Sequence, residues 1–195
     1  TWSEDELYDD VNDFYRYIPD FFEQPDIAID TEGGLRMYGT CIFFQYIDEH
    51  LGGREMIRRC WEYSRDFASS SQNISFTAIN AALEEQNSSF VDAYNHMRIA
   101  NQIMSSHQNA EPYSYDEADG YLTVINRPTV NKVFYFEEGN LYTESNWTLD
   151  LYESHYYSLE TNSPVTLTLV PDSGPLSDLS FFTITNLSST NVWSV

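Results

Sequence analysis

Residues 89–104, SFVDAYNHMRIANQIM, carry the clearest helical pattern in the chain. Apolar side chains recur there at intervals of three or four residues, which is the period of an α-helix with one buried face. They are Phe90, Ala93, Tyr94, Met97, Ile99, Ala100 and Ile103. The stretch therefore predicts a long amphipathic helix, and the neighbouring sequence can be read outward from it.

The sequence before residue 89 repeats the same period. It predicts helices over residues 3–18, 37–51, 54–68 and 76–86, with Pro19 breaking the first helix or opening a short second one at Asp20–Glu23. Gly52 is a natural stop after residue 51. Helices this close in sequence pack as antiparallel neighbours, so residues 1–108 are expected to form an antiparallel helical bundle.

After about residue 110 the period changes to two, which is typical of β-strands. Turn residues separate six candidate strands, and residues 191–195 read as a final edge strand. The candidate strands are residues 121–125, 132–136, 147–152, 155–159, 165–170 and 180–185. This spacing predicts an antiparallel β-sandwich over residues 109–195, and the whole chain is expected to be α+β.

The chain has a large excess of acidic over basic residues. Asp and Glu number 31 against 9 Lys and Arg, the formal net charge is −22, and Lys132 is the only lysine. Such a surface repels phosphate, which argues against nucleic-acid binding and disfavours anionic membranes. Acidic, lysine-poor surfaces suit high salt, so a halophilic source is one interpretation and simple solubility is the other.

Some sequence features favour secretion of the protein and others do not. No apolar stretch is long enough to insert in a membrane, and the N-terminus has no signal-peptide pattern, so Thr1 is expected to begin a mature product or an excised piece. Cys41 and Cys60 fall on two helices joined at Gly52–Gly53, where they form either a disulfide or two buried thiols. Four Asn-x-Ser/Thr sequons are candidate glycosylation sites of an exported protein: Asn73, Asn87, Asn146 and Asn186.

No complete catalytic or metal site can be read from the sequence. The histidines are His50, His96, His107 and His155; none are spaced for zinc as i, i+4, and no His-Glu-x-x-His occurs. No nucleophile elbow or phosphate-binding glycine loop is present either. Residues 116–120, DEADG, match a calcium loop in part, so Asp116 and Asp119 are candidate calcium ligands, with a plain turn as the alternative.

The first ~105 residues resemble the gluzincin-type zinc metallopeptidase-like proteins that bacteria and archaea secrete. The resemblance rests on residues 1–8, TWSEDELY, on Tyr38-Gly39-Thr40, and on residues 43–52, FFQYIDEHLG. It continues through residues 57–62, IRRCWE, the 78–83 helix and residues 90–94. In that family a His-Glu-x-x-His helix and a later glutamate hold the zinc, and the resemblance places both before Thr1. No zinc ligand therefore falls on this chain, and Glu4, Asp5 and Glu6 would at most support the ligands from outside the coordination sphere.

Two functions follow as expectations. The first is a catalytically incomplete portion of a secreted zinc metallopeptidase-like protein, in which the helices form one wall of the cleft and the β-sandwich is an accessory module. The second is a non-enzymatic extracellular module for adhesion or surface assembly, in which a strand edge near residues 191–195 pairs with a neighbouring chain. Both place the protein outside the cell or at its surface. Its partner would be a protein or peptide, another copy of the chain, or the upstream peptidase half.

Overall fold

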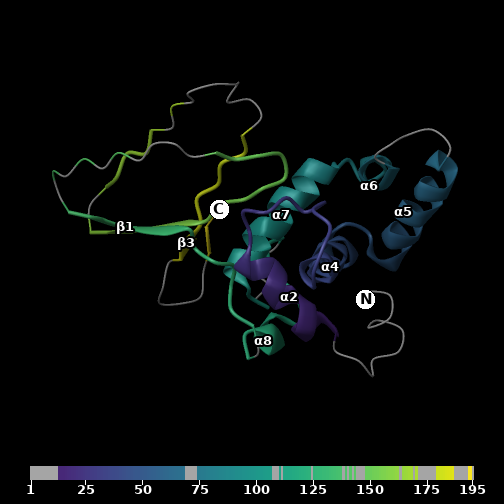
Figure 1. Ribbon diagram of the computed structural model, residues 1–195, viewed down its shortest axis with the longest axis horizontal. Coiled ribbons are helices and arrows are strands. Elements are labelled where there is room, and N and C mark those ends of the chain that lie inside the picture. The colour runs from purple at the N-terminus through teal and green to yellow at the C-terminus, as the bar shows by residue number, and fades with distance from the viewer. Residues whose placement is uncertain are drawn as a thin grey trace.

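The computed structural model describes residues 13–68, 74–106, 110, 112–123, 125–137, 139, 141, 143, 148–162, 164–168, 170, 179–186 and 193–194. Its helices gather on one side of the molecule, and a long β-containing segment extends on the other (Figure 1). The helices are α2 (Asp13–Glu23), α3 (Arg36–Gly39), α4 (Cys41–His50), α5 (Gly53–Phe67), α6 (Ile74–Glu84), α7 (Phe90–Ile103) and α8 (Ala118–Tyr121). Within the described ranges, no helix is both long and apolar enough to cross a membrane.

The predicted helical bundle is present in the described residues with corrected boundaries, and residues 3–12 of the first predicted helix lie outside them. Helix α7 matches the 89–104 pattern: Ser89 caps it by accepting a 3.0 Å hydrogen bond from the Asp92 amide, and Met104 ends it in a left-handed conformation. The predicted helix 37–51 is instead α3 and α4. Helix α2 continues through Pro19 to Glu23, so the expected break at Pro19 was wrong. Ile18, Phe21 and Phe22 are all buried on that helix, and their burial offsets the hydrogen bond that proline removes.

One glycine sets how closely α2 and α3 pack. A Cβ added at Gly39 would lie 2.8 Å from Cβ of Phe21 and closer still to the carbonyl oxygen of Tyr17. Real Cβ atoms do not approach other atoms so closely. Gly39 is therefore the residue that lets the backbones of the two helices touch.

The predicted β-sandwich was wrong. Among the described residues the strands form two pairs: β1 (Lys132–Phe136) with β2 (Tyr157–Thr161) in parallel, and β3 (Thr185–Asn186) with β4 (Trp193–Ser194) antiparallel. In the first pair Lys132 aligns with Tyr157 and Phe136 with Thr161. Only β1 keeps its predicted bounds. No strand occurs in the described parts of 147–152 and 165–170, and the predicted strands at 155–159 and 180–185 are replaced by β2 and β3.

The predicted strand 121–125 is also wrong, for a reason visible in its spacing. Ala118, Tyr121 and Ile125 are buried at intervals of three and four residues, which is a helical period. The Leu122 amide donates to the Ala118 carbonyl at 3.1 Å, and the Ile125 amide donates to the Tyr121 carbonyl at 2.8 Å. This segment thus adds a helical turn to the bundle rather than a strand to a sheet.

The chain beyond residue 110 also packs on the helices. Tyr152 places its ring against Phe76, Phe90 and Tyr94, and its carbonyl accepts a 2.6 Å hydrogen bond from the Tyr94 hydroxyl. The Thr129 amide donates to the Phe22 carbonyl at 2.9 Å. Residues on both sides of position 108 therefore share one core, while the division at 108 stays a prediction.

Candidate functional site

The two cysteines lie in the core. Cys41 begins α4 and Cys60 lies midway along α5, and both are 4 % exposed. No disulfide joins them, and burial raises the pKa of the Cys60 thiol to about 11. The structure thus has the two cysteines as buried thiols. The disulfide stays a prediction, which a count of reactive thiols can test.

Two of the four candidate glycosylation sites lie in the part of the chain that the structure describes. Asn87 is exposed in the turn between α6 and α7, where its φ of 55° is left-handed, a conformation that asparagine adopts more readily than most residues. Asn186 ends β3. Asn73 and Asn146 lie outside the described residues. Carbohydrate attachment at the four sequons stays a prediction.

The candidate calcium ligands do not lie in a loop of the expected kind. Asp119 belongs to α8, and Asp116 precedes that helix; both side chains are exposed. Within the described ranges, no group of three or more His, Cys, Asp or Glu side chains is arranged to hold a metal ion. Residues 116–117 form a turn that leads into this helix, and calcium binding by Asp116 and Asp119 stays a prediction.

An acidic cluster that the sequence analysis did not identify lies between α4 and residues 112–118, with Glu49 largely covered and Glu117 exposed. Glu49 on α4 is 11 % exposed at its side chain. Its Oε1 accepts a 2.7 Å hydrogen bond from Gln45 Nε2, and its Oε2 accepts a 3.0 Å bond from the Asp116 amide. The same Gln45 nitrogen donates at 3.3 Å to Oε2 of Glu117. One amide group therefore lies between two carboxyl groups that are far apart in sequence.

This environment changes the acidity of Glu49. Burial is the largest cause, and it raises the pKa of the Glu49 carboxyl to about 8. Hydrogen bonds from Gln45 and from the Asp116 amide oppose the shift, whereas the negative charges of Glu117 and Asp116 add to it. Burial and the two neighbouring negative charges thus favour the protonated form of the Glu49 carboxyl.

Further polar contacts join the same two segments. His50 Nε2 lies 2.8 Å from the Ser114 carbonyl oxygen, and the Tyr46 hydroxyl donates to the Pro112 carbonyl at 3.1 Å. The hydroxyl of Tyr115 donates at 2.7 Å to Oδ1 of Asn101 on α7, and burial raises the pKa of Tyr115. Helix α4 therefore contacts residues 112–116 through polar groups as well as through the ring contact between Tyr46 and Tyr115.

One signal for the cluster was present in the sequence. Gln45 and Glu49 stand four residues apart in a helix whose neighbouring positions are apolar, so a polar pair facing inward was detectable. Their partner Glu117 lies far along the chain, and no local pattern connects it to α4.

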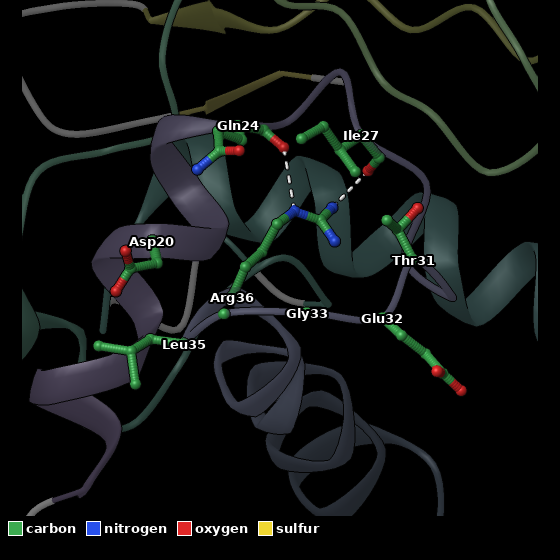
Figure 2. Close-up of a pocket in the computed structure, with 9 residues that line it drawn as sticks. Asp20, Gln24, Ile27, Thr31, Glu32, Gly33, Leu35 and Arg36 are labelled. Atoms are coloured by element: carbon green, nitrogen blue, oxygen red, sulfur yellow. Dashed lines mark hydrogen bonds between the residues drawn. The ribbon is translucent and has the colours of Figure 1, made fainter.

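A separate pocket of about 260 Å³ lies between α2 and the loop that leads into α3. Arg36 runs along it toward the carbonyl groups of Gln24 and Ile27, while Glu32 points outward (Figure 2). The Arg36 guanidinium also donates to the Ala28 carbonyl at 3.0 Å. Because all three of its nitrogens bond backbone oxygens, this arginine holds the loop in place rather than offering a charge to a ligand.

The comparisons with known proteins add no assignment. No family model, curated protein or solved structure matches the chain. Any function must therefore be argued from its own residues.

Proposed function

We propose that this chain is the helical wall and accessory segment of a secreted zinc metallopeptidase-like protein, and that it is not a complete catalytic unit by itself. In this proposal the zinc-binding residues precede Thr1 in the parent protein. A zinc ion there would supply an activated water for attack on a peptide carbonyl. No catalytic step is assigned to the described residues, because they contain no group suited to hold the metal.

One observation supports the proposal: landmark residues of the family resemblance are packing residues of a single helical unit. Gly39 allows α3 to touch α2, and Gly52 takes a φ of 117° between α4 and α5. Cys60, Phe90 and Tyr94 lie in the same core. Part of the resemblance therefore falls on positions that determine how the helices pack, as a shared helical subdomain requires, whereas Tyr38 and Trp61 are exposed.

The test starts from the parent reading frame. We expect it to encode His-Glu-x-x-His and a later glutamate upstream of Thr1, and the longer protein to bind one zinc ion and cleave peptides until a chelator removes the metal. The matched control is the 195-residue chain alone, which should show neither property. A signal-peptide cleavage site directly before Thr1 would remove the basis of the proposal.

An adhesion or surface-assembly module is the second candidate, and one observation favours it. Large apolar side chains are exposed along the β-containing segment, among them Leu141 at 91 %, Leu151 at 75 % and Val170 at 76 %. Exposed apolar side chains are typical of surfaces that bind proteins when they form a contiguous patch. Sedimentation velocity in low and high salt tests self-association, since screening of the net charge should permit it only in high salt. A monomer at every salt concentration would count against this candidate.

A further inference from the structure

Strand β1 belongs to a sheet that has very few strands. Within the described residues it pairs with β2 alone, so no described strand lies along its other edge. Parallel strands normally occur in larger sheets that are covered on both faces, and a sheet of two strands is only marginally stable by itself. The pair of β1 and β2 therefore has the geometry of a sheet that a further strand would complete.

The side chains of β1 do not protect this edge. Edge strands usually avoid further pairing through charged residues, proline or bulges. Residues 133–136, VFYF, contain no charge and no proline, and Tyr135 is 63 % exposed. The Phe134 ring lies 6.1 Å from the Phe136 ring and 6.0 Å from the Tyr157 ring, measured between centroids. An aromatic surface thus spans both strands of the pair.

The two ends of β1 carry opposite charges. Lys132 begins the strand, and the exposed Glu137 follows its last residue. A strand with this pattern is complementary to an antiparallel copy of itself, because each lysine then lies beside the glutamate of the other strand. Full overlap of two such strands also places Phe134 opposite Phe134 of the second copy, on a two-fold axis.

The charge of the rest of the molecule favours this strand over β2. Copies of a chain with a net charge of −22 repel each other, so they can meet best where acidic residues are sparse. Residues 120–136 contain no Asp or Glu and include Arg127 and Lys132. Strand β2 contains Glu160 and no basic residue. Two copies of β2 in antiparallel order would bring their Glu160 side chains close together, which is unfavourable.

We propose that β1 is a self-association strand, whose open edge pairs with the β1 edge of a second copy of this chain in antiparallel order. Main-chain hydrogen bonds between the two β1 strands hold the dimer, and the pairs of Lys132 with Glu137 set its register. Because most of the remaining surface is acidic, the dimer forms when salt screens the long-range repulsion. The inference rests on the surface-assembly candidate and is independent of the peptidase proposal.

The experiment is sedimentation equilibrium of the whole chain over a range of protein concentrations. It is run in about 0.3 M sodium chloride, where a screening length of roughly 6 Å weakens long-range repulsion more than ion pairs in contact. The unmodified chain should dimerise. Lys132→Glu and Glu137→Lys should each raise the dissociation constant by roughly tenfold, because each replaces two attractive pairs by two repulsive ones. The double variant with both changes restores the pairs, so its dissociation constant should return to near that of the unmodified chain.

Overall charge alone predicts a different result. If only general repulsion mattered, Lys132→Glu would weaken association and Glu137→Lys would strengthen it. Arg65→Glu on α5 is the matched control, because it changes the net charge as Lys132→Glu does, on an exposed side chain. Helix α5 and strand β1 lie on opposite sides of the molecule (Figure 1). Arg65→Glu should therefore change the dissociation constant much less than Lys132→Glu.

Three results would overturn the proposal. Tighter association of Glu137→Lys than of the unmodified chain is the first, and a double variant that does not recover is the second. A chain that dimerises without responding to any of these changes would overturn the β1 interface and leave the surface-assembly candidate standing. The third is a chain that stays monomeric at every salt and protein concentration, which would count against both.

Discussion

At the scale of single residues, Gly39 shows how an absent side chain fixes the distance between two helices. Its position leaves no room for a methyl group between α2 and α3. We expect Gly39→Ala to lower the free energy of unfolding by about 1–3 kcal/mol, the usual cost of overpacking a tight contact. Chemical denaturation followed by circular dichroism measures it.

The control for this change is Met37→Ala in the same short helix. Met37 is 41 % exposed, so its truncation should alter stability by less than about 0.5 kcal/mol. Equal stability of Gly39→Ala and the unmodified chain would mean that α2 and α3 do not touch as described.

The cysteines allow a second prediction at this scale. With a pKa of about 11 and only 4 % exposure, the Cys60 thiol should react slowly with alkylating reagents in the folded protein at pH 8. Unfolding without reductant should release two reactive thiols per chain, which mass spectrometry can count. If neither cysteine reacts until a reductant is added, the two are joined as a disulfide.

At the scale of elements, Arg98 on α7 joins the segment that follows α2 to the segment that precedes β2. Its guanidinium donates at 2.7 Å to Oγ of Ser154 and also to the Pro25 carbonyl, and it lies 5.3 Å from the Phe21 ring centre. Lysine is charged but lacks the forked geometry that serves both acceptors. We expect Arg98→Lys to cost about 1.5–3 kcal/mol of stability, the usual value for hydrogen bonds of a charged group.

Arg65→Lys on α5 is the matched control, because the Arg65 side chain is 73 % exposed beside Asp66. It should change stability by less than about 0.5 kcal/mol. Should the two substitutions have equal effects in thermal unfolding, Arg98 would not be the anchor that its contacts indicate.

The elements also show what a sequence can and cannot predict. Helices α5 and α7 were predictable because apolar residues recur in each every three or four positions, although α7 is buried on all sides from Met97 to Asn101. The β-sandwich was not, because alternation describes one strand and says nothing of its neighbours. Residues 148–168 alternate partly in sequence, yet most of their side chains are exposed or only half-buried.

The cluster of Gln45, Glu49 and Glu117 was likewise only partly predictable from the sequence. Gln45 and Glu49 could be recognised as an inward polar pair, since both lie on one helix. The raised pKa of Glu49 could not, because it depends on burial by residues 112–118 and on the charge of Glu117. Contacts between segments so distant in sequence leave no local pattern.

At the scale of the whole molecule, the charge imbalance at the surface is larger than the composition suggests. Three arginines donate hydrogen bonds to backbone carbonyls or to Ser154, namely Arg36, Arg98 and Arg127. Arg36 and Arg98 are only 5 % exposed. Fewer of the nine basic residues are therefore left to offset the 31 acidic ones at the surface. Self-repulsion of this kind opposes the compact state.

Salt should therefore stabilise the protein. Raising sodium chloride from about 0.05 M to about 0.5 M shortens the screening length and weakens the repulsion between surface carboxylates, so the Tm should rise by several degrees. Differential scanning calorimetry measures it. The control is the same series near pH 4, where many carboxylates are protonated and the rise should shrink. A Tm that does not change with salt concentration at pH 7 would show that repulsion between surface charges does not limit stability.

The contacts of Tyr152 and Tyr156 have a consequence for how the chain is made. Tyr152 covers the aromatic rings of Phe76, Phe90 and Tyr94, and the Tyr156 hydroxyl donates at 2.8 Å to the Arg98 carbonyl. Synthesis proceeds from the N-terminus, so α6 and α7 leave the ribosome well before these two tyrosines. Until then the aromatic face of the nascent helices is open to other chains and to chaperones. A nascent chain stalled near residue 110 should therefore be incompletely folded and prone to bind other chains. A nascent chain of which residue 156 has emerged from the ribosome should not.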